Sequence, residues 1–96
     1  MIIGVSQITL HLPDSQSLKD KRQIIKSVMA RIRNRFEVAI AEVEEQNLWQ
    51  IAVLGMSCVS NNRQHAEEIL GQVRRYIEET RPDVIVSNVE NELISW

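Results

Sequence analysis

The sequence predicts an α+β domain built from four strands and two helices in the order βαββαβ. Three observations support this: side chains alternate between two faces in four segments, apolar residues recur every three to four positions in two others, and short polar breaks separate the segments. The 96 residues, 44% hydrophobic and 25% charged, suit a single soluble domain over residues 1–96.

The first half of the chain predicts strand, helix and strand. A strand is expected at Ile2–Leu12, where β-branched residues are frequent. Pro13 ends this strand, and Ser17 is a suitable N-cap for a helix at Leu18–Phe36. Its apolar stripe has helical spacing and consists of Leu18, Ile25, Val28, Met29, Ile32 and Phe36. Alternation resumes over Phe36–Glu45, which predicts the second strand.

The second half of the chain repeats the strand–helix–strand order. After a polar turn at 46–47, the segment Trp49–Val59 is apolar on both faces, which is typical of a central strand. A second helix is expected at Arg63–Thr80, because Pro82 prevents its continuation. The last strand is expected at Asp83–Ile94.

The simplest closed arrangement of these elements is a ferredoxin-like sandwich. It has a four-stranded antiparallel sheet in the order 4-1-3-2, with two helices on one face. We further expect the first and third strands to lie side by side and parallel, so that both helices begin at one edge of the sheet. The outer apolar row of the third strand would then be uncovered, which predicts a homodimer through the open sheet face.

Charge is distributed unevenly along the chain, whose formal net charge is −2. Residues 1–36 hold seven basic and two acidic residues, a net +5, whereas residues 37–96 hold four basic and eleven acidic residues, a net −7. At 100° per residue, four cations of the first helix lie within a sector of about 60°. They are Lys19, Arg22, Lys26 and Arg33, and Lys21 is a further cation of the first turn.

These cations predict contact with RNA, because phosphate contacts dominate nucleic-acid affinity. A solvated helix face and a docking surface for an acidic protein are the alternatives. Basic residues at the end of a helix are favourable, but Lys19, Lys21 and Arg22 oppose the dipole in the first turn. A binding role would explain cations that local helix energetics does not favour.

A parallel arrangement of the first and third strands would also bring both helix N-termini together. Residues 13–17 and 60–63 would converge, and Ser17, Asn61 and Arg63 would contribute to an anion site. Local capping by Ser17 and by Asn61 or Asn62 is the alternative explanation.

No arrangement of residues in the sequence indicates catalysis, a metal or a cofactor. His11, Cys58 and His65 lack paired metal-ligand spacing, and the serines lack a nucleophile-elbow context. We therefore expect a protein that is not an enzyme and binds no metal. The central strands offer only Trp49 as a ring, so base stacking on the sheet is not expected.

Several short strings are similar to the YlxP-like family of small bacterial proteins. They are His11-Leu12-Pro13, Ser17-Leu18-Lys19, Lys21-Arg22, Arg31, Arg33, Arg35-Phe36, Ala41-Glu42, Leu48-Trp49-Gln50, Leu54-Gly55 and Val59-Ser60-Asn61. The resemblance implies a ferredoxin-like domain of unknown function. Because genes of this family often neighbour those of a translation initiation factor and a ribosome-binding factor, it also implies a connection with translation or ribosome maturation.

The sequence therefore predicts a binding domain that contacts RNA or a ribosomal partner through its first helix. The alternatives are a dimeric protein-interaction module without nucleic-acid binding and a small-molecule regulatory domain. Because the sequence has neither a targeting signal nor a long apolar stretch, the expected location is the cytoplasm.

Overall fold

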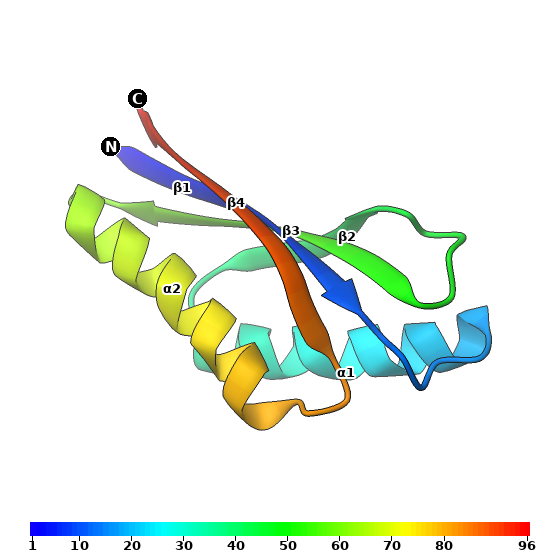
Figure 1. Cartoon of the computed structure of the whole chain (residues 1–96). Coiled ribbons are helices and arrows are strands. Elements are labelled where there is room, and N and C mark those ends of the chain that lie inside the picture. The colour runs from blue at the N-terminus through cyan, green and yellow to red at the C-terminus, as the bar shows by residue number, and fades with distance from the viewer.

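The structure, a computed structural model that describes residues 1–96, contains the six expected elements in the expected order. Their bounds are β1 Ile2–His11, α1 Leu18–Arg35, β2 Ala39–Glu44, β3 Ile51–Ser60, α2 Arg63–Thr80 and β4 Ile85–Ser95. The four strands form one antiparallel sheet in the order β2-β3-β1-β4, and both helices lie on the same side of it (Figure 1). This arrangement confirms the predicted ferredoxin-like fold.

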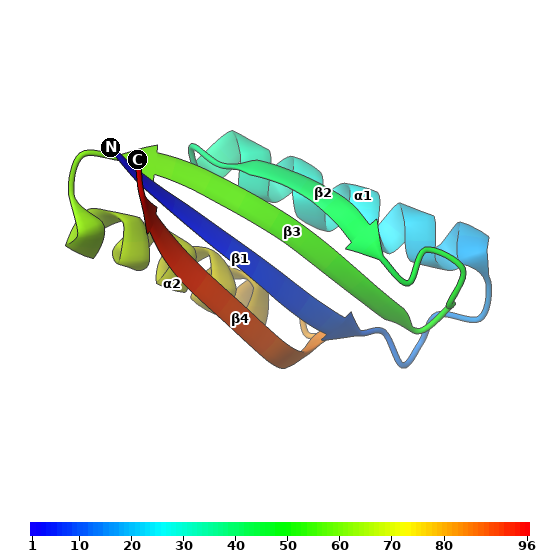
Figure 2. The same cartoon turned by 90° about the horizontal axis from the view of Figure 1, so that it is seen from above.

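The prediction that β1 and β3 are parallel is wrong. The two strands pair antiparallel, with Ile2 opposite Ser60 and His11 opposite Ile51. The crossover through α1 makes β2 run parallel to β1, and the hairpin then reverses the chain, so β3 must run against β1. The helices therefore begin at opposite ends of the sheet, separated by a ten-residue strand of about 30 Å. Figure 2 shows these two ends.

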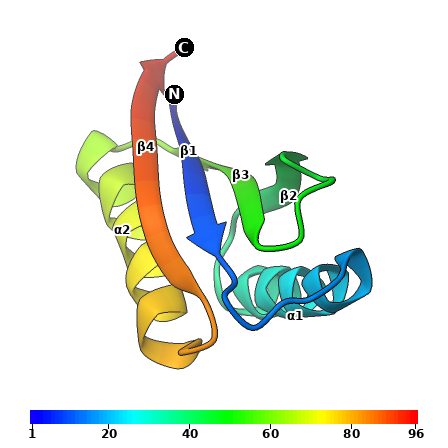
Figure 3. The same ribbon diagram turned by 45° about the vertical axis from the view of Figure 1, so that its right-hand side comes forward.

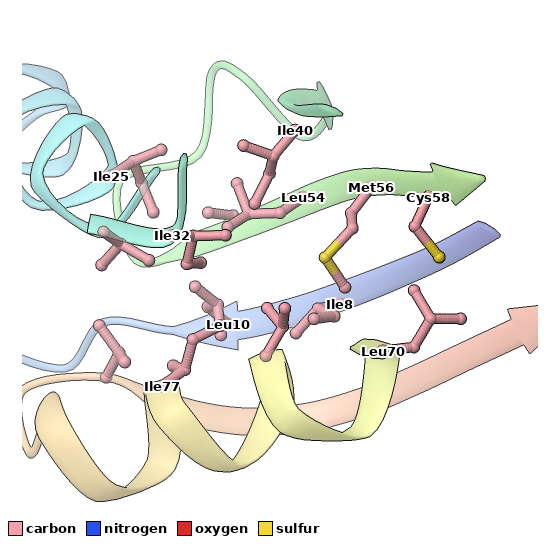
Figure 4. Packing of buried hydrophobic residues seen from close by; sticks show 14 of the residues in the cluster. Ile8, Leu10, Ile25, Ile32, Ile40, Leu54, Met56, Cys58, Leu70 and Ile77 are labelled. Carbon is pink, nitrogen blue, oxygen red and sulfur yellow. The ribbon is translucent and has the colours of Figure 1, made fainter. Parts of the chain in front are cut away.

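The hydrophobic core lies between the sheet and the two helices (Figure 4). Alternate residues of β1 and β3 point into it, among them Ile8, Leu10 and Leu54. α2 packs against β1, β3 and β4, whereas α1 packs against β2 (Figure 3). Neither helix has the length and apolar character that crossing a bilayer requires.

Two predicted boundaries shift because tertiary contacts override the local pattern. Phe36 is not in a strand: it caps α1 through its backbone N–H, and its ring packs edge-on against Tyr76 with the centroids 5.6 Å apart. Trp49 precedes β3 and belongs to the hairpin loop, the name used below for residues 45–50.

The open face of the sheet, the side without helices, is apolar in part and contains no lysine or arginine. The outer row of β3 is unevenly covered, because Val53 is 6% exposed whereas Val59 is 65% exposed. Val43 helps to cover this side, since a Cβ added to Gly55 would lie only 2.7 Å from Val43 Cγ1. The outer side of β4 carries Glu90 and Glu92 opposite Gln7 and Val5 of β1.

Candidate nucleic-acid interface

Four cations form a row along one flank of α1. Lys19, Arg22, Lys26 and Arg33, called the basic row below, are all exposed. From Lys19 to Arg33 the row spans fifteen residues of helix, a rise of about 21 Å. None of the four side chains forms a salt bridge, although acidic residues outnumber basic ones in the chain. Their positive charge is therefore available to an external anion.

Arg33 shows where this flank lies in the fold. Its Nη2 donates a hydrogen bond of 2.7 Å to the carbonyl oxygen of Ile40 in β2. Because β2 is an edge strand of the sheet, the basic row lies along the outer side of the molecule and away from α2. The bond uses one of the five guanidinium N–H groups and leaves the others for a ligand.

The opposite flank of α1 is engaged with α2. The guanidinium of Arg35 lies 5.0 Å from the centre of the Tyr76 ring, a cation–π contact. Beyond α2, Arg81 donates to Asp83 at 2.8 and 2.9 Å and to Ser27 of α1 at 2.9 Å. The Arg81 guanidinium, with a smaller contribution from Arg31, lowers the pKa of Asp83 below its usual range. These cations serve helix–helix packing, whereas the basic row lies on the flank that has no contact with α2 and no acidic partner.

Lys21 does not belong to the interface, contrary to the prediction. Its side chain points inward and the residue is 1% exposed. The ammonium donates to the carbonyl oxygens of Glu45 at 2.6 Å and Leu48 at 2.8 Å, and it lies 2.9 Å from Glu42 Oε2. The two carbonyls accept hydrogen bonds from the ammonium, and the carboxylate pairs with its positive charge. The first-turn position of Lys21 is explained by this structural role and needs no ligand.

The predicted anion site at converging helix N-termini is not formed. Ser17 and Asn61 belong to loops at opposite ends of β1 and β3, because these strands are antiparallel. Ser17 Oγ instead accepts from the N–H of Asp20 at 3.0 Å, and Asp20 Oδ2 accepts from the N–H of Gln16 at 3.0 Å. This capping arrangement satisfies N–H groups at the start of α1 and places a carboxylate there.

At the start of α2, the cap is Asn62 rather than Asn61. Asn62 Oδ1 accepts from the N–H of His65 at 3.1 Å. Arg63 Nη1 donates to Ser95 Oγ of β4 at 3.2 Å, so it ties α2 to the last strand. Asn61 and Arg63 lie at the opposite end of the sheet from the start of α1, and neither is on the helix that carries the basic row, so we exclude both from the candidate interface.

The sulfur and imidazole groups take structural positions. Cys58 is buried in the core, where burial raises the pKa of its thiol above the usual value. His65 Nδ1 lies 3.2 Å from Ser60 Oγ at the start of α2. His11 is exposed at the end of β1.

Sequence reasoning missed the way in which the hairpin loop is attached to α1. Gln50 Nε2 donates to the carbonyl oxygens of Ser15 at 3.0 Å and Pro13 at 3.3 Å, and Lys21 binds two further carbonyls of the loop. Glu45 adopts a left-handed conformation with φ of 58°, which is uncommon for a residue with a side chain. A first-turn lysine followed by a polar hairpin was the only sequence signal of this attachment.

Fold and site together define a ferredoxin-like α+β sandwich with a basic first helix. Two de novo designed proteins share the architecture at a TM-score of 0.53 each. Foldit4 is 13% identical, with 100% of this chain and 99% of that protein covered. LFR1 1, a design with a ferredoxin fold, is 12% identical, with 100% and 87% covered. At these identities the likeness concerns the fold alone.

The chain belongs to the family described as "Protein of unknown function (DUF503)", which matches residues 3–90. The uncharacterized protein YlxP of Bacillus subtilis (strain 168) is 34% identical to it over 77 residues, which cover 80% of this chain and 84% of that protein. This similarity confirms the resemblance drawn from the sequence motifs.

Proposed function

We propose that this domain is a non-enzymatic RNA-binding protein that contacts the phosphate backbone through the basic row. The observation that carries the proposal is the alignment of four exposed cations over about 21 Å without an acidic partner. A row of this kind can neutralise successive phosphates and release their counterions.

The charge on the other surfaces also favours α1 as the side of the molecule that binds RNA. All lysines and arginines lie on the two helices except Arg81, which follows α2 directly. The open sheet face carries Glu44, Glu90 and Glu92, whose carboxylates repel phosphates. RNA is therefore expected on α1 and not on the sheet, where many proteins of this fold bind bases.

Reversing three charges of the basic row tests the proposal. With four phosphate contacts, the affinity for a single-stranded 15-nucleotide oligo(U) falls about 50-fold between 50 and 200 mM salt, a log–log slope of about −2.8. In Lys19→Glu/Arg22→Glu/Lys26→Glu only Arg33 remains, and the slope shrinks to about −0.7. Fluorescence anisotropy of the labelled RNA measures both values, and purified ribosomal subunits serve as a second probe because the family resemblance implies a ribosomal connection.

A matched control separates position from net charge. Arg63→Glu/Arg74→Glu/Arg75→Glu on α2 moves the formal net charge from −2 to −8, as the α1 variant does. It is expected to keep the salt dependence of the unmodified protein. Equal losses in the two variants, or binding that salt does not weaken, would overturn the proposal.

We propose self-association through the open sheet face as a second candidate. The observation that favours it is a set of exposed aliphatic side chains on this face, namely Val43, Ile51, Val59, Ile85 and Ile94. Such a set is typical of a surface that a partner covers. A second copy of the chain is the expected occupant.

Light scattering at high micromolar concentration tests this second candidate. The expected mass is twice the 11.1 kDa of the chain. Ile51→Glu/Val59→Glu is expected to restore a monomer, whereas the α2 charge-reversal variant stays dimeric. A strictly monomeric unmodified protein would exclude the dimer and leave the RNA proposal untouched.

A further inference from the structure

The hairpin loop, which lies at the end of the sheet where α1 begins (Figures 1 and 2), exposes an aromatic side chain. Trp49 is 55% exposed, and the preceding Leu48 is exposed as well. Together with Ile51 they line a shallow apolar hollow at this end of the sheet. Figures 1 and 2 both place the hairpin loop next to the first turns of α1.

Hydrogen bonds fix the backbone on both sides of Trp49. On one side, the carbonyl of Leu48 accepts from the buried ammonium of Lys21 at 2.8 Å. On the other side, the carbonyl of Gln50 accepts from the N–H of Leu12 at 2.8 Å. The Gln50 side chain adds a bond of 3.0 Å to the carbonyl of Ser15. The backbone at Trp49 is therefore held in place from both sides, although the Trp49 side chain is exposed.

The attachment also determines where Trp49 lies relative to the positive charges. Lys21, whose ammonium binds the carbonyl next to Trp49, belongs to the same first turns of α1 as Lys19 and Arg22, although its side chain points inward and theirs are exposed. A ring near a line of cations is the combination that proteins use for single-stranded nucleic acids, because the cations follow the phosphates while a base stacks on the ring. Every nucleobase offers a π-face, so the ring does not require a particular sequence.

We propose that Trp49 stacks on an unpaired nucleobase of an RNA strand whose phosphates follow the basic row. This inference rests on the proposed RNA binding and specifies its substrate class as RNA with unpaired bases. The buried Lys21 has a role in it as a positioning residue, since its ammonium holds the loop that presents the ring.

The chain contains 2 tryptophans, which makes the proposal testable by fluorescence. Trp96 is 84% exposed and lies at the other end of the sheet, where its backbone N–H donates to the backbone carbonyl of Met1. Trp96→Phe leaves Trp49 as the only indole, and Trp49→Phe leaves Trp96. Titration with the 15-nucleotide oligo(U) is expected to quench the emission of the Trp96→Phe protein and not that of the Trp49→Phe protein.

Affinity provides an independent readout. Loss of one stacked base in Trp49→Ala weakens oligo(U) binding by about 5- to 150-fold. The same variant is expected to bind a blunt 15-base-pair RNA duplex as the unmodified protein does, and Trp96→Ala is the matched control for both probes. Because Trp49 is exposed, circular dichroism is expected to show an unchanged fold.

The outcomes distinguish this inference from the RNA proposal. Salt-dependent oligo(U) binding without quenching of Trp49, and with unchanged affinity in Trp49→Ala, would overturn the stacking role and keep the RNA proposal. Binding of the duplex but not of oligo(U) would also overturn the stacking role and keep the RNA proposal. If neither RNA binds, both proposals fail.

Discussion

Replacing Lys21 with Met lowers the free energy of unfolding by about 3–5 kcal/mol, the range seen when one partner of a buried ion pair is removed. The methionine retains the apolar stem but not the ammonium. The carbonyls of Glu45 and Leu48 lose their common donor, and the buried Oε2 of Glu42 loses the positive charge that compensates for its desolvation. Urea denaturation followed by circular dichroism measures the loss.

Lys26→Met is the matched control, because Lys26 is on the same helix but is exposed and unpaired. Its unfolding free energy is expected to stay within about 0.5 kcal/mol of the unmodified protein. A loss below about 1 kcal/mol in Lys21→Met would show that the buried contacts do not hold the hairpin loop.

Truncating Leu54 to Ala lowers the free energy of unfolding by about 2–5 kcal/mol. Leu54 is fully buried in β3, on the side that faces the helices (Figure 4). The truncation removes buried apolar atoms and leaves a cavity that close-packed neighbours fill only in part. At about 4–8 °C per kcal/mol for a domain of this size, the melting temperature falls by roughly 8–40 °C.

The outer row of β3 supplies the control for this prediction. Val59→Ala, on the open face, is expected to change the stability of the monomer by no more than about 0.5 kcal/mol. Thermal denaturation at low protein concentration compares the two variants without contributions from self-association. Comparable losses would mean that the two sides of β3 are equally covered in solution.

Much of the fold is predictable because its signals are local. The alternation over Ile2–Leu12 and the helical stripe from Ile25 to Ile32 each depend on residues within a few turns or a single strand. They correctly identify the side that is buried: Ile8 and Leu10 in β1, and Ile25 and Ile32 in α1, are all in the core. Strand direction is a different matter, because it follows from the connections and not from side-chain patterns, and the parallel prediction for β1 and β3 failed there.

The candidate site is predictable only in part, because part of it depends on contacts and strand directions that local patterns do not contain. Helical periodicity alone places Lys19, Arg22, Lys26 and Arg33 on one flank. It does not separate them from Lys21, whose carbonyl partners are 24 and 27 residues further along the chain. The predicted roles of Ser17, Asn61 and Arg63 depended on the wrong strand direction and were lost with it. The small-molecule alternative stays a prediction.

The sequence by itself determined the order of the elements, the faces they bury and the concentration of positive charge on the first helix, because each depends on neighbours within a few residues. Only the tertiary structure decided which of those charges are available. The hairpin brought carbonyl acceptors and Glu42 to Lys21 and left the basic row without acidic partners. It also placed the loop that carries Trp49 next to the first turns of α1, since the position of a loop is determined by the elements it joins and by the groups that bind its backbone.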